Sequence, residues 1–351
     1  RKRPGTPISE DREECLGHAV SRDLVHWEER PVAFCPDPNN PQDDSTPWTG
    51  CALWNEGKGY LYYTMRGARE NKQVQRIGLA TTKDPDCWNR YPGNPVIMPD
   101  PKWYGCIGNP IPNTLDCRDL IVIPDPQSPG WLGFYVTRKP GRELPETCVI
   151  ACARSSDLIH WEHLPPAFAP EKYATIEVPD VFEIDGRWYL TCLTGNGYGN
   201  RGIWSDPNLT QGTMYAVSDR PEGPYEELAD NALVVGCTSA PISCRSVLLD
   251  GQRYVLYTDR ERKDHLDHEH LVHGTLSTPK VLRTNGDRLY AAYSDRIECC
   301  VTLECIGADS GYPWSETTTW GHAWHWDMPT AHWDRSGRIQ GYSCTGWGVL
   351  P

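Results

Sequence analysis

The sequence contains little methionine or phenylalanine, no sustained helical periodicity and no long hydrophobic run. Only 4 Met and 4 Phe occur among 351 residues, against 31 Gly, 31 Pro, 15 Trp and 17 Tyr. Apolar residues do not recur at the 3.6-residue spacing of amphipathic helices, which argues against a helical bundle. No stretch approaches the roughly 20 apolar residues that a membrane-spanning helix needs. We therefore expect an all-β protein that does not bind or cross a membrane.

Basic residues are in the minority. The chain has 34 Lys and Arg against 47 Asp and Glu, which gives a formal net charge of −13. Proteins that bind nucleic acid usually present a basic surface, so this balance argues against such a partner. A neutral sugar is indifferent to net charge. The expected partner is a small-molecule or oligosaccharide substrate, and the oligomeric state is left open.

The sequence also lacks the motifs of common cofactor and metal sites. Its 15 cysteines do not form the CxxC pairs of structural zinc sites, and it has no Gly-rich phosphate loop and no GxSxG elbow. We predict no cofactor and no metal. Cys148, Cys152 and Cys192 lie in apolar, strand-like segments and are expected to be buried free thiols. Disulfides are compatible with export, but spacing alone does not pair the cysteines, and either a secreted or a cytoplasmic location is compatible with the sequence.

A short motif recurs along the chain. The pattern Asp-Leu-aliphatic-His-Trp-Glu occurs at residues 23–28 and 157–162, with looser copies at 82–88 and 218–225. A second series of predicted strands lies between these copies, and each of its members is followed by a turn and an aromatic strand. These strands span residues 48–54, 117–123, 177–184 and 243–249. The dipeptides Asp185-Gly186 and Asp250-Gly251 are strong hairpin signals within the series.

This repeat has a period of about 60–70 residues and about four strands per unit, which is typical of propeller blades. Four units are clear, and the remaining sequence suffices for a fifth. We therefore predict an all-β, five-bladed β-propeller of four-stranded antiparallel blades over residues 1–298. Residues 299–351 would either close the ring as inner strands of the first blade or begin an accessory β-sheet.

The candidate catalytic residues lie at the starts of the predicted strands. The first strand of each propeller blade lines the central channel, so Trp48, Asp119 and Glu177 should meet at one mouth of it. Glycoside hydrolysis needs two carboxyl groups flanking the scissile bond. The charge of Arg118 would favour an ionised Asp119. The alternative is that both acids only cap strands or form salt bridges, which spacing alone does not exclude.

These segments resemble those of a known family. Residues 17–27, Gly-His-Ala-Val-Ser-Arg-Asp-Leu-Val-His-Trp, resemble the end of the first blade in glycoside hydrolase family 32, which contains invertases, inulinases and levanases. The segments 48–52, 117–120 and 177–180 are similar to its aromatic-Ser-Gly-Ser, Arg-Asp-Pro and Glu-Cys-Pro-Asp motifs. The chain departs from each motif at one position: Thr49 replaces the first Ser, Leu120 replaces Pro, and Val178 replaces Cys. The resemblance runs in order from about residue 17 to 295.

The resemblance implies the roles of the predicted site residues. Glu177 would be the general acid/base and Asp119 the transition-state stabiliser in a retaining double displacement without cofactor or metal. The other residues that we expect to contact substrate are Arg118, Trp48, Thr49, Asp180 and Trp326.

The nucleophile is the main departure from the family. In the family it is an Asp well upstream of the Gly-His-Ala motif, and the 16 residues before that motif here do not match. A candidate lies at the other end of the chain, where Asp327 follows Trp326 in a predicted strand. Asp327 would take the nucleophile position if the ring closes through this strand, as in a circular permutation. Otherwise, residues 300–351 begin an incomplete accessory sheet.

Three functions compete on this basis. The first is a hydrolase of β-D-fructofuranosyl linkages in sucrose or fructans. The second is a propeller glycosidase that acts on arabinose or xylose linkages, because such enzymes share the architecture. The third is a catalytically inactive sugar-binding propeller, which the altered motifs favour.

Overall fold

The computed structural model describes most of the chain, and the regular structure in it is almost entirely β-strand. The described residues are 15–109, 111–141, 146–195, 200, 211–236, 243–262, 271–300, 331–333 and 339–342. Helical structure in these stretches is limited to two short 3₁₀ turns, η1 (Ala68–Glu70) and η4 (Asp295–Cys300). None of the described helices has the length and apolar character needed to span a bilayer. The prediction of an all-β protein is confirmed.

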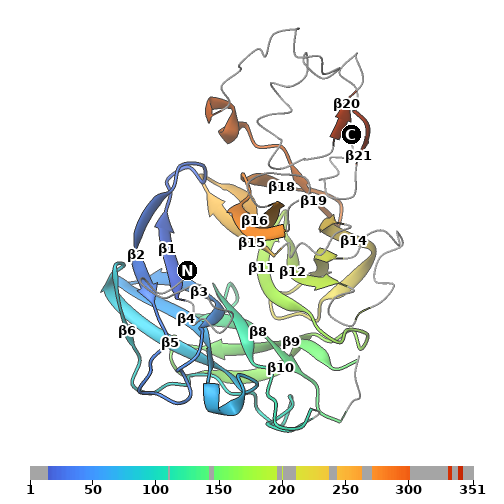
Figure 1. The fold of residues 1–351 in the computed structure, drawn as a ribbon. Coiled ribbons are helices and arrows are strands. Elements are labelled where there is room, and N and C mark those ends of the chain that lie inside the picture. Colours follow the sequence, from blue (N-terminus) through green and yellow to red (C-terminus); the bar gives the residue numbers. More distant parts are fainter. Residues whose placement is uncertain are drawn as a thin grey trace.

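Consecutive strands form four antiparallel sheets that surround a common centre (Figure 1). The first sheet contains β3 (Trp48–Asn55), β4 (Lys58–Arg66), β5 (Gln75–Asp84) and β6 (Cys87–Arg90). The second contains β7 (Arg118–Pro124), β8 (Trp131–Arg138), β9 (Cys148–Ser155) and β10 (Glu162–Phe168). The third contains β11 (Glu177–Ile184), β12 (Arg187–Gly195), β13 (Gln211–Ser218) and β14 (Glu226–Gly236). The fourth contains β15 (Cys244–Leu249), β16 (Gln252–Arg262), β18 (Lys280–Asn285) and β19 (Arg288–Ala292), with β17 (Leu271–Leu276) also paired to β16.

The hairpins between the first two strands of three sheets follow from their turn dipeptides. Both residues of Glu56-Gly57, Asp185-Gly186 and Asp250-Gly251 have positive φ angles. Two-residue turns of this kind match the right-handed twist of the flanking strands. The two Asp-Gly hairpins were predicted from the sequence and are confirmed.

A two-stranded sheet, β1 (Leu16–Val20) with β2 (Glu28–Phe34), resembles the outer half of a blade. In the turn between its strands, the Ser21 hydroxyl accepts the amide of Leu24, and the Asp23 carboxylate accepts the amide of His26, both at 2.8 Å. The corresponding serine and aspartate make the same contacts in the turn between β9 and β10. Because β9 and β10 are the third and fourth strands of their sheet, β1 and β2 occupy the corresponding places in a further blade.

The β1–β2 hairpin lies between the first and fourth sheets (Figure 1). Leu24 packs with Tyr254 and Leu256 of β16, and the ring of Phe34 lies 4.5 Å from that of Tyr63 on β4. The hairpin thus fills the fifth position of the ring. In the described residues the ring consists of four sheets of at least four strands and the outer pair of a fifth.

The open side of this hairpin explains an exposed tryptophan. In the second sheet, Trp161 covers β8, where a Cβ atom on Gly133 would come within 2.8 Å of the indole. The equivalent Trp27 is 42% exposed, because no described strand pairs with the other edge of β1. A hollow of about 620 Å³ lies here, lined by residues 20–23, 26–28 and 30. None of the predicted site residues lines it.

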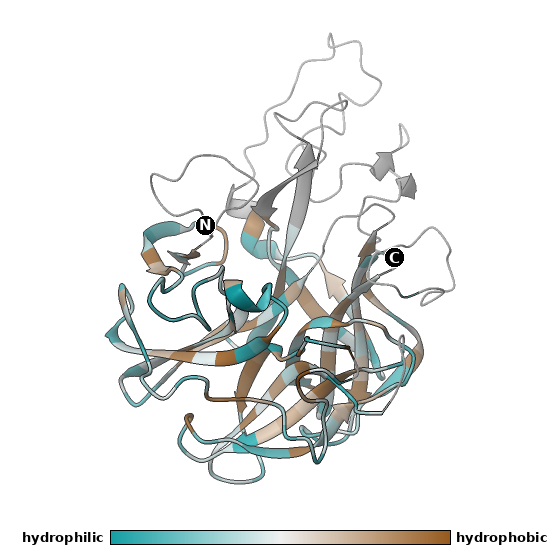
Figure 2. Ribbon diagram, turned by 60° about the horizontal axis from the view of Figure 1, so that its bottom comes forward, coloured by the Kyte–Doolittle hydropathy of each residue, from teal (hydrophilic) through white to brown (hydrophobic). Residues whose placement is uncertain are grey.

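Apolar side chains of neighbouring sheets pack together and form the core. One cluster joins the first and second sheets through residues such as Tyr62 and Leu120, and another joins the second and third. Figure 2 shows that the hydrophobic residues concentrate on the strands, while the connecting loops are mainly hydrophilic. The thiols of Cys148, Cys152 and Cys192 are buried and free, as predicted.

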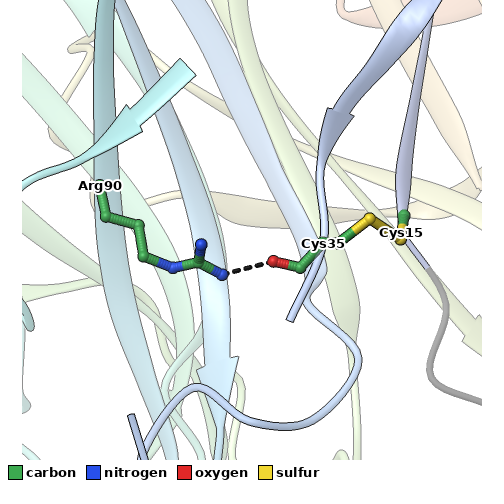
Figure 3. The surroundings of a disulfide bond; sticks show 3 residues. All are labelled: Cys15, Cys35 and Arg90. Carbon is green, nitrogen blue, oxygen red and sulfur yellow. Dashed lines mark hydrogen bonds between the residues drawn. A yellow bond between two sulfur atoms is a disulfide. The ribbon is translucent and has the colours of Figure 1, made fainter. Parts of the chain in front are cut away.

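A disulfide closes the open end of the β1–β2 hairpin. Cys15 and Cys35 are bonded, and Arg90 of β6 donates a hydrogen bond to the Cys35 carbonyl (Figure 3). The Arg90 Nε also lies 2.6 Å from Asp43 Oδ2, which accepts a second hydrogen bond from Tyr63 Oη at 2.8 Å. These contacts tie the hairpin to the first sheet.

Two further strands lie near the C-terminus. β20 (Ala331–Trp333) and β21 (Ile339–Tyr342) pair only with each other among the described strands. The prediction that residues 299–351 either close the ring or begin an accessory sheet stays a prediction.

Candidate active site

The first strands of three successive sheets share an irregularity near their starts. The pairing register shifts between residues 48 and 51 in β3, between 118 and 121 in β7, and between 177 and 180 in β11. Such bulges bend a strand and redirect its side chains, and they are frequent next to active sites. The predicted residues Trp48, Asp119 and Glu177 therefore all lie at these bulges. The strand β7 contacts both β3 and β11.

Two bulged residues adopt left-handed backbone conformations. Asp119 has φ = 62° and Val178 has φ = 49°. This region costs an L-residue about 1–2 kcal/mol and is especially rare for a β-branched side chain. The conformation brings the Val178 amide to 2.9 Å from Asp119 Oδ2, so that the buried carboxylate accepts a backbone hydrogen bond from the neighbouring sheet.

Arg118 lies between the two predicted catalytic acids. Its Nη2 is 3.3 Å from Glu177 Oε1, and its Nε is 3.6 Å from Asp119 Oδ2. Its Nη1 lies 2.7 Å from Asp116 Oδ1, which holds the guanidinium in place. The Glu177 side chain is 25% exposed, whereas that of Asp119 is 4% exposed. The structure therefore brings the two acids to one arginine and leaves only Glu177 open to solvent.

Burial controls the protonation of Asp119. Desolvation is the largest influence and raises the pKa of this carboxyl group from 3.8 to about 6. Arg118 opposes the rise, as the sequence predicted, while the neighbouring Glu177 charge adds to it. The net shift is upward because Asp119 is almost completely buried and its loss of hydration outweighs the attraction of the nearby cations.

The hydroxyl of Thr64 connects the first and second sheets at the site. Thr64, on β4, is fully buried. Its Oγ1 donates to the Thr49 carbonyl at 2.8 Å and accepts from the Asp119 amide at 3.1 Å. One side chain thus fixes the bulge of β3 relative to that of β7.

Trp48 and Thr49 form the exposed edge of the first sheet at this site. Trp48 is 38% exposed, and the Arg66 guanidinium lies 3.4 Å from its ring centroid in a cation–π contact. The next residue, Gly50, leaves no room for a side chain because a Cβ atom would lie 2.0 Å from the Tyr62 carbonyl oxygen. An aromatic ring held in a fixed orientation suits the apolar face of a sugar.

The third and fourth sheets are joined beside Glu177. Asp180 is 4% exposed, and its Oδ2 accepts the Ser246 amide at 2.6 Å. Arg245 donates from Nη1 to the Pro179 carbonyl at 2.6 Å and from Nη2 to the Gly50 carbonyl at 3.3 Å. In the structure, the predicted substrate contact Asp180 thus binds protein backbone.

The remaining predicted residues fall elsewhere. Trp326 and Asp327 lie outside the described residues, so their roles stay predictions. In the part of the chain that the structure describes, no group of three or more His, Cys, Asp or Glu could hold a metal ion.

The sequence reasoning missed Thr64 and Arg245. Thr64 gave no signal, because its importance arises only from strand pairing. Arg245 did give one: Cys244-Arg245 repeats Cys117-Arg118 at the start of another first strand.

Comparison with known proteins identifies relatives of this chain. The model of the glycosyl hydrolases family 32 N-terminal domain matches residues 9–219. A levanbiose-producing levanase of Bacillus subtilis is 31% identical over 204 residues, which cover 54% of this chain and 34% of that protein. The vacuolar acid β-fructofuranosidase 4 of Arabidopsis thaliana is 40% identical over 91 residues, covering 24% of this chain and 13% of that protein.

The fold likeness extends over more of the chain. A Bombyx mori family 32 β-fructofuranosidase, solved in complex with sucrose, has a TM-score of 0.62 with 20% identity and covers 82% of this chain and 57% of that one. At this identity the comparison shows the propeller fold alone. The matched region of this chain spans well under half the length of both curated relatives.

Proposed function

We propose, because this chain belongs to glycosyl hydrolase family 32, that it forms the propeller of a retaining glycosidase that cleaves β-D-fructofuranosyl linkages in sucrose or fructans. The observation that carries the proposal is the placement of Asp119 and Glu177 on either side of Arg118, at bulges of adjacent sheets. The relatives support the sugar class, since their names are those of a levanase and a β-fructofuranosidase.

Glu177 is the general acid/base in this proposal. Its partly exposed carboxyl group can reach a bound glycoside. In the first step a carboxylate nucleophile forms a bond to the anomeric carbon of the fructosyl unit. The bond from that carbon to the glycosidic oxygen breaks, and Glu177 gives its proton to this oxygen. In the second step water attacks the same carbon and gives a proton to Glu177, and the ester bond to the enzyme breaks.

Asp119 is the transition-state stabiliser. Its carboxylate is fixed by the Val178 amide and by the ion pair with Arg118. A carboxylate held in this way accepts hydrogen bonds from sugar hydroxyls without having to reorient, and these bonds strengthen as positive charge develops on the fructosyl ring. Trp48 and Thr49 line the same mouth and are proposed substrate contacts, together with Arg118, Asp180 and Trp326.

The nucleophile remains a separate proposal. We assign it to Asp327, which a retaining mechanism requires to lie about 5–5.5 Å from Glu177. The substitution D327N should abolish turnover while sucrose or fructan binding persists. If D327N retains full activity, Asp327 is not the nucleophile, whereas the roles of Glu177 and Asp119 still stand.

The decisive experiment is substrate-resolved hydrolysis by the full chain. Reducing-sugar release would be measured on sucrose, inulin and levan, and on aryl arabinosides and xylosides for comparison. We expect release from fructosides only, and the E177Q variant should lose turnover but keep binding. The matched control is E183Q, which removes a carboxylate further along β11, on the exposed part of the strand, and should leave turnover unchanged.

Each other outcome identifies a different function. Release from arabinosides or xylosides instead would assign the chain to pentose linkages. Fructan binding without hydrolysis, measured by calorimetry, would show an inactive sugar-binding propeller. Hydrolysis that survives E177Q would refute the acid/base role.

A further inference from the structure

A single arginine of the fourth sheet reaches two other sheets at the site. Arg245, at the start of β15, donates to the carbonyl of Pro179, 66 residues away, and to that of Gly50, 195 residues away. Both acceptors belong to bulged segments: Pro179 lies between Glu177 and Asp180 in β11, and Gly50 lies between Trp48 and Cys51 in β3. Arg245 therefore connects the fourth sheet to the first and third at the channel.

The internal repeat places Arg245 at a position similar to that of Arg118. Each arginine follows a buried cysteine at the start of a first strand. Arg118 bridges the carboxyl groups of Asp119 and Glu177, whereas Arg245 bridges backbone carbonyl groups that flank them. The two guanidinium groups thus act on one site from sheets that are not adjacent.

The contacts at the mouth form a closed chain. Thr64 links β3 to the Asp119 amide, the Asp119 carboxylate accepts the Val178 amide, and Arg245 returns from β15 to β3. The third and fourth sheets are also linked by the Ser246 amide, which donates to the Asp180 carboxylate. Each catalytic acid is consequently positioned by residues of a neighbouring sheet.

We propose that Arg245 is a positioning residue of this active site, which fixes the bulge that carries Glu177 and supplies positive charge to the buried carboxyl group of Asp119. This inference rests on the proposed glycosidase function. It concerns a residue that touches no reacting atom and acts through the backbone of Pro179 and Gly50.

The charge on Arg245 has a measurable consequence. Among the described residues, the charged groups that shift the pKa of Asp119 are Arg118 on its own strand, Glu177 on β11 and Arg245 on β15. Arg245 lowers the pKa of Asp119, so its neutralisation should raise that pKa above its present value of about 6. Lysine at this position would keep the charge but could not donate two hydrogen bonds in the fixed geometry of a guanidinium group.

The test compares R245Q and R245K with the native chain, using R154Q as the matched control. Arg154 is a partly buried arginine of the second sheet that pairs with Asp125 and has no contact with the acids. The pKa of Asp119 would be followed by ¹³C NMR titration of labelled aspartate, with the signal assigned by D119N. Turnover and KM would be measured on the best fructoside.

For R245Q we expect a higher Asp119 pKa and a loss of kcat of about tenfold or more with little change in KM, as misplaced catalytic groups produce. R245K should restore the pKa of Asp119 but recover kcat only in part. R154Q should change neither quantity.

An unchanged Asp119 pKa and unchanged kcat in R245Q would overturn the proposal. A uniform loss of stability with proportional loss of active protein, and with no pKa change, would also overturn it by showing a merely structural arginine. If the native chain hydrolyses no sugar, the proposed function fails, but the NMR titration still tests the electrostatic role of Arg245.

Discussion

Replacement of Thr64 by valine tests how the first and second sheets are joined at the site. The two side chains have nearly the same shape, so T64V removes the hydroxyl group and little else. The hydroxyl is buried and makes hydrogen bonds of 2.8 Å to the Thr49 carbonyl and 3.1 Å to the Asp119 amide. After the substitution the Asp119 amide is buried without an acceptor.

The expected cost follows from this geometry. A buried donor without a partner destabilises a protein by about 1–3 kcal/mol. Thr49 is exposed, so water can replace the Thr64 hydroxyl as donor to the Thr49 carbonyl. The loss of that hydrogen bond should therefore contribute little to the loss of stability. We expect T64V to lower the free energy of unfolding by about 2 kcal/mol. T64S keeps the hydroxyl and loses one buried methyl group, which costs about 1 kcal/mol.

The assay is urea unfolding followed by tryptophan fluorescence, with the m-values compared to confirm that the same surface unfolds. The order of stability should be native, then T64S, then T64V, although valine restores the lost methyl volume. Catalytic efficiency should fall further in T64V than in T64S, because Asp119 loses one of its backbone anchors. If T64V matches or exceeds T64S in both stability and activity, the hydroxyl does not join the two bulges as argued.

Three further predictions follow from other contacts. Because burial raises the pKa of Asp119 to about 6, this group is protonated below that pH, and kcat/KM on a fructoside should decline there in a pH–rate profile; an acid limb that appears only near pH 4 would contradict this. The E56N variant should raise the free energy of unfolding by about 0.5–1 kcal/mol, because Glu56 is exposed with φ = 47° in a two-residue turn where asparagine is favoured; a lower urea midpoint would contradict it. The double substitution C15S/C35S opens a loop with a sequence separation of 20 residues, and it should destabilise the β1–β2 hairpin by about 3 kcal/mol, seen as faster amide exchange in β1 and β2; unchanged exchange there would show that packing alone holds the hairpin.

The sequence predicted the fold well because the propeller repeats a local signal. The Asp-Leu-aliphatic-His-Trp motif makes its turn through contacts between residues two or three apart, as at Asp23 and Asp157, so it is visible in any one copy. The repeat then placed Asp119 and Glu177 near the starts of neighbouring first strands, one residue apart in register, and the structure shows both beside Arg118.

What the sequence could not supply depends on pairing between distant segments. Thr64 matters only because β4 brings it beneath β7, and the Cys15–Cys35 disulfide was one of many possible pairings of 15 cysteines. The upward pKa shift of Asp119 was also hidden, because adjacency to Arg118 is visible in the sequence whereas burial is not.

The bond from the Val178 amide to Asp119 has a consequence for how the protein is made. The second sheet is synthesised before β11, and until β11 is present the Asp119 carboxylate lacks the amide partner that holds it. The arrangement of the two predicted catalytic acids therefore depends on the contact between the second and third sheets, and it forms only after β11 has been synthesised. A fragment that ends before β11 would contain Asp119 but would lack both the Val178 amide that holds it and Glu177.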